Sequence, residues 1–141
     1  MAPITMAAMI DPMTTRPTIN AMSQRVPWGK SVSIDLFDCN RTTLSDPQII
    51  KDFIIGVIKS IGMQAHGPTH IDRFGDPQCG LEGWSAMQFI ETSSITLHAD
   101  EMGNRCFIDI FSCKDFDASK ACHFAKTCFQ SKSEKISTLS R

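Results

Sequence analysis

The sequence predicts an α+β fold: a two-layer sandwich with a small, mainly antiparallel sheet and two helices on one face. Apolar and polar residues alternate in several short segments, which is typical of strands with one buried face. Two longer segments repeat their apolar residues at helical spacing. The segments follow one another in the order β-α-β-β-α-β, which favours one sheet with both helices packed against it.

The chain as a whole has the composition of a globular domain. It has 141 residues, of which 42% are hydrophobic and 21% charged, and its formal net charge is −1. Residues 1–27 are rich in Met, Thr, Ala and Pro and show no sustained period, so we expect a flexible N-terminal extension. Residues 28–141 are then expected to form a single domain.

Composition also argues against several partners and sites. A net charge near zero provides no basic surface for nucleic acid, and no apolar run is long enough to span a membrane. The N-terminus lacks the basic and then apolar order of a secretory signal peptide, so we expect a cytoplasmic chain whose cysteines are reduced. The sequence has no CxxC or CxxH pair, and we therefore expect no metal site.

The first half of the domain is expected to hold one strand and one helix. Residues 31–37, SVSIDLF, alternate apolar and polar side chains as a strand does. Ser45 is the expected N-cap of the helix, since Gln48 lies at the capping-box spacing. The helix is expected to end near Gly62. Its apolar residues recur at helical spacing and should form a buried stripe: Ile50, Phe53, Ile54, Val57, Ile58 and Ile61.

The second half is expected to hold most of the sheet. Residues 66–83 contain several Gly and Pro and are expected to form a loop. Residues 86–91 and 94–99 have strand character, either as two strands or as one strand bent at the serine pair between them. Three further elements complete the prediction: a strand at 106–113, a helix from about Asp117 and a short strand at 135–139.

Hydroxyl, imidazole and thiol side chains lie on or beside the strands in the middle of the chain. Ser93 and Ser94 precede His98, Cys113 ends the next expected strand, and Ser85 lies upstream in GWSAMQF. Each has an ordinary explanation on its own. A serine hydroxyl can bond to the backbone, a strand histidine can be satisfied locally, and most free cysteines are small core residues. Together they indicate a compact reactive site.

The segment from Gly29 to the C-terminus resembles the short prokaryotic S-adenosylmethionine decarboxylases, which are pyruvoyl-dependent and self-processing. In that family a serine becomes the pyruvoyl group, a histidine follows five residues later, a cysteine follows fifteen residues after the histidine, and a second serine precedes the first by eight. Ser93, His98, Cys113 and Ser85 have these spacings without a gap. The strand that carries the cysteine also ends as in the family, with DIFSC at residues 109–113. The family's N-terminal pattern of a Gly, a strand with an acidic residue and then a Cys is matched by Gly29, Asp35 and Cys39.

The resemblance implies that the chain cleaves itself between Thr92 and Ser93. Ser93 would become the pyruvoyl cofactor, which forms a Schiff base with the substrate amine. His98, as a base, and the Ser85 hydroxyl would serve the processing reaction. Cys113 would donate a proton after the loss of CO2. The implied protein is a homodimeric S-adenosylmethionine decarboxylase of polyamine (spermidine) biosynthesis.

Two departures from the family pattern bear on substrate and processing. Thr92 stands where the family has a Glu before the processed serine, and Met102 stands where it has a Glu that holds the nucleoside, although Glu101 is adjacent. We expect Glu101 and Trp84 to help bind the substrate, Trp84 by packing at the pocket wall or by stacking. Two alternatives follow: a pyruvoyl-dependent decarboxylase of ornithine or arginine, and a non-processing homologue that acts as a binding or regulatory subunit.

Overall fold

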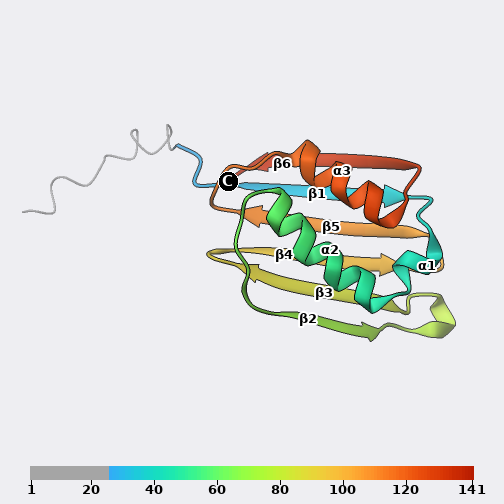
Figure 1. Cartoon of the computed structure of the whole chain (residues 1–141). Helices are drawn as coiled ribbons and strands as arrows, with labels where there is room; N and C mark the ends of the chain where they lie inside the picture. The colour runs from blue at the N-terminus through green and yellow to red at the C-terminus, as the bar shows by residue number, and fades with distance from the viewer. Residues whose placement is uncertain (1–25) are drawn as a thin grey trace, which may run out of the picture.

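The computed structural model describes residues 26–141, which form a single antiparallel sheet with helices on one face (Figure 1). The expected N-terminal extension, 1–27, lies almost wholly outside the described residues. The strand order in the sheet is β2-β3-β4-β5-β1-β6. The bounds of the strands are β1 Lys30–Phe37, β2 His66–Phe74, β3 Gly83–Ile90, β4 Ser93–Asp100, β5 Arg105–Ser112 and β6 Ser133–Ser140.

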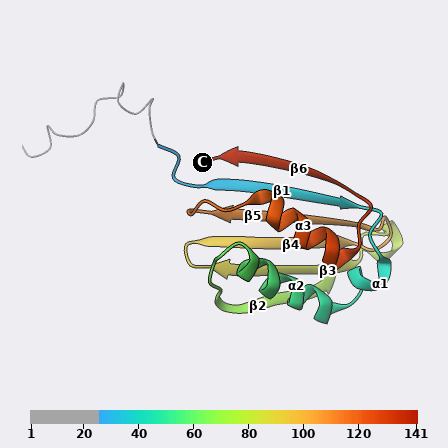
Figure 2. The same ribbon diagram turned by 45° about the horizontal axis from the view of Figure 1, so that its top comes forward.

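The two longer helices lie side by side on the same face of the sheet, as both views show (Figures 1 and 2). They are α2, Pro47–Ser60, and α3, Ala118–Phe129, and a short helix α1, Arg41–Leu44, precedes α2. This arrangement confirms the predicted two-layer α+β sandwich. The opposite face, which we call the open face, carries no helix from the described residues. None of the helices among residues 26–141 has the length and hydropathy that crossing a bilayer requires.

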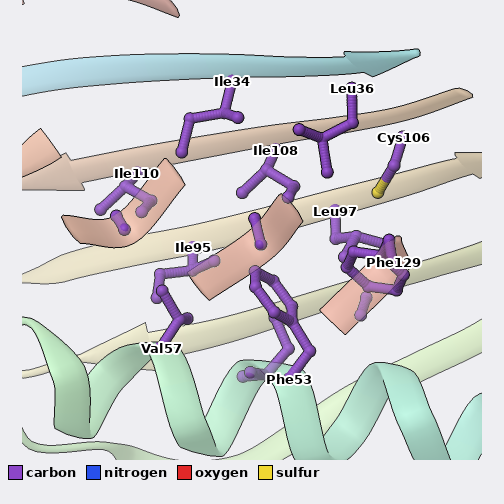
Figure 3. Packing of buried hydrophobic residues seen from close by; sticks show 14 of the residues in the cluster. Ile34, Leu36, Phe53, Val57, Ile95, Leu97, Cys106, Ile108, Ile110 and Phe129 are labelled. Carbon is purple, nitrogen blue, oxygen red and sulfur yellow. The ribbon is translucent and has the colours of Figure 1, made fainter. Parts of the chain in front are cut away.

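The hydrophobic core fills the space between the sheet and the two longer helices (Figure 3). The alternation predicted for the first strand places its apolar residues on this side, and the helical stripe of α2 faces them. Phe53 of α2 packs against Phe129 of α3, with ring centroids 5.0 Å apart. The side chains that fill the centre are fully buried: Ile34, Leu36, Phe53, Ile95, Leu97, Ile108, Ile110 and Phe129.

The structure corrects the expected loop at residues 66–83. Residues 66–74 form β2, an edge strand, and only the remainder is a loop with one short 3₁₀ turn at Pro77–Cys79. The register of β2 shifts between His66 and His70, around Pro68. Because an edge strand leaves one side of its backbone unpaired, it tolerates a proline and needs no alternating apolar pattern. The sequence prediction of a loop had relied on the Gly and Pro residues of this segment.

Two further local expectations need correction. The N-cap of α2 is Asp46, whose carboxylate accepts hydrogen bonds from the backbone N–H groups of Gln48 and Ile49 at 2.8 and 3.4 Å. Ser45 instead ends the short helix α1. Residues 86–99 form two strands, β3 and β4, rather than one bent strand, since the chain reverses at a tight turn before Ser93.

Candidate active site

The start of β4 and the end of β5 bring a serine and a cysteine together. Ser93 is the first residue of β4, and Cys113 follows the last residue of the neighbouring strand β5. The backbone N–H of Cys113 donates to Ser93 Oγ at 3.0 Å, and Ser93 Oγ lies 3.7 Å from Cys113 Sγ. Thr92 Oγ1 shares a hydrogen bond with the same sulfur at 2.8 Å. We call Thr92, Ser93 and Cys113 the turn cluster.

The turn cluster makes its thiol more acidic than an ordinary cysteine. Hydrogen bonds to the sulfur, from Thr92 first and then from Ser93, lower the pKa of Cys113, while partial burial opposes them. The adjacent Lys114 adds a smaller effect in the same direction as the hydrogen bonds. Lys114 is itself held by an ion pair with Glu91, with Nζ and Oε2 2.7 Å apart. The cluster therefore offers a partly exposed thiol with a raised thiolate fraction beside a serine hydroxyl.

The backbone at the turn cluster is constrained. Glu91 has a φ of 48°, in the left-handed region that non-glycine residues rarely adopt. Glu91 lies one residue before the bond that joins Thr92, which is exposed, to Ser93, which is 8% exposed. The chain is continuous here, so this is the geometry of the uncleaved protein. A constrained peptide next to a fixed hydroxyl is what an intramolecular attack on the backbone requires.

A serine–histidine pair occupies the open face. Ser85 on β3 lies directly opposite His98 on β4, and Ser85 Oγ and His98 Nδ1 share a hydrogen bond at 2.8 Å. His98 is exposed, and two hollows flank it, with volumes of about 760 Å³ and 440 Å³. The first is bounded by His70, Asp72 and Met87 among others. The second is bounded by apolar side chains, Phe74, Leu81 and Phe107, and by the charged pair Asp100 and Arg105.

Within one chain, the turn cluster and the Ser85–His98 pair lie apart. Ser93 and His98 lie five positions apart on β4, which at the rise of an extended strand is about 16 Å. The odd separation also sends their side chains to opposite faces of the sheet. The structure therefore joins Ser93 with Cys113, and Ser85 with His98, but separates one pair from the other.

The two residues expected to bind substrate lie away from both groups. Trp84 points to the helix side of the sheet, opposite Ser85, and its indole N–H donates to the backbone oxygen of Ser45 at 3.2 Å. Glu101 is buried, and its carboxylate accepts hydrogen bonds from Arg73, the shorter at 2.9 Å. Neither residue lines the two hollows that flank His98.

The contact between Thr92 and Cys113 could not be found from the sequence, because it depends on the register of β4 against β5.

Within the described residues, no group of three or more His, Cys, Asp or Glu side chains is placed to hold a metal ion.

A family model described as S-adenosylmethionine decarboxylase matches residues 30–141. The chain belongs to the S-adenosylmethionine decarboxylase family. The match covers both the turn cluster and the Ser85–His98 pair. Membership assigns the chain a decarboxylase-type activity, and it does not favour the ornithine, arginine or regulatory alternatives.

The fold agrees with this family. The chain is similar to the crystal structure of the adenosylmethionine decarboxylase from Aquifex aeolicus VF5, with a TM-score of 0.70 and 16% sequence identity. The similarity covers 83% of this chain and 92% of the Aquifex chain. No curated protein sequence matches the chain.

Proposed function

We propose that the protein is a pyruvoyl-dependent S-adenosylmethionine decarboxylase of polyamine (spermidine) biosynthesis that acts in the cytoplasm. It would make its own cofactor by cleavage between Thr92 and Ser93. The observation that carries this proposal is the turn cluster, in which the Ser93 hydroxyl meets a thiol of lowered pKa directly after the left-handed turn residue Glu91. Residues with this chemistry fit a pyruvoyl group formed at Ser93.

The cleavage would begin with attack of Ser93 Oγ on the carbonyl carbon of Thr92. The C–N bond breaks, the nitrogen takes up the hydroxyl proton, and an ester replaces the amide. A base then removes the α-proton of Ser93, and the Oγ–Cβ bond breaks. This step releases the Thr92 carboxylate and leaves dehydroalanine, which water converts to a pyruvoyl group and ammonia. Imidazole is suited to the second step because it titrates near neutrality.

During turnover the pyruvoyl group supplies an electron sink for the loss of CO2. Cys113 would hold a proton beside this position and deliver it to the carbon that has lost CO2. Its sulfur is 3.7 Å from Ser93 Oγ in the uncleaved chain, which supports that role. The exposed His98 and the apolar hollow beside it would contact the substrate.

The separation of Ser93 from His98 supports a homodimer with shared sites. If both residues serve one reaction, a second copy must supply one of them. Two copies packed through their open faces, with a two-fold axis crossing near the middle of β4, would bring His98 of one copy toward the end of the sheet at which β4 of the other begins. Apolar side chains on this face are exposed and would be covered by the contact: Met87 at 42%, Phe89 at 49% and Leu139 at 60%.

Mass spectrometry of the purified protein tests the proposal. We expect two fragments that meet at Thr92–Ser93, a blocked N-terminus on the smaller one, and release of CO2 from S-adenosylmethionine but not from ornithine or arginine. Ser93→Ala should abolish both cleavage and activity, whereas Ser94→Ala should retain cleavage. A single full-length mass after prolonged incubation would refute self-processing.

A further inference from the structure

We propose that Thr92 is a positioning residue for Cys113: its side-chain hydroxyl holds the sulfur beside Ser93 and donates a hydrogen bond to the thiolate. The proposal rests on the function proposed above and assigns Thr92 a role in addition to its place at the cleaved bond. It also gives a physical meaning to one of the two residues by which this chain departs from the family pattern.

The geometry favours Thr92 over Ser93 as the main partner of the sulfur. Thr92 Oγ1 lies 2.8 Å from Cys113 Sγ, and Ser93 Oγ lies 3.7 Å from it. Either atom of the Thr92–Cys113 pair can donate while the thiol is neutral. A thiolate carries no hydrogen, so the Thr92 hydroxyl must then be the donor.

The cleavage chemistry makes the Thr92 contact the lasting one. Ser93 loses its hydroxyl when it is converted, because that oxygen leaves with the carboxylate of Thr92. The Thr92 side chain is unchanged by the reaction. Of the two hydroxyl groups that contact the sulfur in the uncleaved chain, only that of Thr92 therefore survives the reaction, on a residue that then ends in a carboxylate.

The Thr92 hydroxyl affects the pKa of Cys113 more than the neighbouring charge does. Lys114, the cation whose charge acts on the thiol, is paired with Glu91 at 2.7 Å. This acidic partner reduces the effect of Lys114 on the thiol. In agreement, the hydrogen bond from Thr92 is the largest cause of the lowered pKa of Cys113.

The experiment measures the pH dependence of Cys113 alkylation by iodoacetamide, resolved by mass spectrometry of the modified peptide. All variants carry Ser93→Ala, so that none can cleave and the contribution of Ser93 is absent throughout. Thr92→Val removes the hydroxyl and keeps the β-branched shape, and Thr92→Ser keeps the hydroxyl. Thr138→Val, on exposed β6, is the matched control, and the fully buried Cys106 is the internal standard for an unreactive thiol.

We expect Thr92→Val to shift the alkylation profile to higher pH and to slow alkylation at pH 7 by about threefold or more, because the thiolate loses a donor. Thr92→Glu should shift the profile in the same direction, since it places a negative charge near the sulfur. Thr92→Ser and Thr138→Val should leave the profile unchanged. Circular dichroism melting curves check that each variant is folded.

Two results would overturn the proposal. Thr92→Val could give the profile of the parent, or Thr92→Ser could shift it as far as Thr92→Val does, which would attribute the effect to packing of the methyl group. Neither readout uses cleavage or activity. A chain with an intact Ser93 that fails to process would refute the proposed function and leave the result on Thr92 standing.

Discussion

Two reactive side chains, one after the end of β5 and one on β4, face different surroundings. Cys113 lies beside the peptide that precedes Ser93, whereas His98 lies on the open face with Ser85 as its hydrogen-bond partner. The thiol is therefore placed to act at Ser93 within its own chain, and the imidazole is not. Processing and turnover should accordingly depend on the two residues in different ways.

Replacing these two residues should separate processing from turnover. Cys113→Ala should still cleave, at least in part, but turn over slowly and inactivate itself by transferring the substrate amine to the pyruvoyl group. His98→Ala should stop at the ester, from which hydroxylamine releases the fragments. Gel electrophoresis with and without hydroxylamine, together with CO2 release, measures both effects. A Cys113→Ala variant with an unchanged steady-state rate and no self-inactivation would return Cys113 to a structural role.

The sequence identified the candidate site residues but not their arrangement in the sheet. The spacing of Ser93, Cys113, Ser85 and His98 predicted one compact site, whereas the structure joins them through hydrogen bonds as two pairs, Ser93 with Cys113 and Ser85 with His98. It did not indicate that the pairs lie far apart, although five positions along a strand imply both the distance and the opposite faces. Trp84 is on the helix side for the same reason, because it alternates with Ser85.

At the scale of elements, the start of α2 depends on one carboxylate. Asp46→Ala should lower the free energy of unfolding by about 1 kcal/mol, because two backbone N–H groups in the first turn lose their acceptor. Ser45→Ala should change it by less than about 0.5 kcal/mol, since the Ser45 side chain does not cap this helix. Chemical denaturation measures both. Equal losses in the two variants would contradict the assignment of Asp46 as the cap.

A buried face made β1 and β5 predictable from the sequence, whereas β2 lacks that signal. β1 and β5 have alternating burial, so their apolar residues mark them in the sequence. β2 is exposed along most of its length and is held by pairing with β3, which leaves no periodic signal. The turn between β3 and β4 was ambiguous because Glu91 adopts a left-handed conformation without being a glycine.

At the scale of the whole molecule, a mixed dimer tests whether sites are shared. A Ser93→Ala chain and a His98→Ala chain should each fail to process alone. Co-expressed, they should form dimers in which one site has an intact Ser93 and an intact His98 from different copies. We expect cleavage of the His98→Ala chain without hydroxylamine, and a dimer mass by light scattering. Absence of cleavage in a confirmed mixed dimer would show that each site belongs to one chain.

The strand order has a consequence for the cleaved protein. A cut between Thr92 and Ser93 would divide the sheet between β3 and β4, yet β1 from the first fragment lies between β5 and β6 from the second. The two fragments would be interleaved through the sheet, and they would stay together until the core itself is disrupted. The intact precursor folds as one chain, but the cleaved protein would have to refold from two. Its recovery from denaturant would therefore depend on protein concentration, so that the cut makes a once unimolecular folding reaction bimolecular.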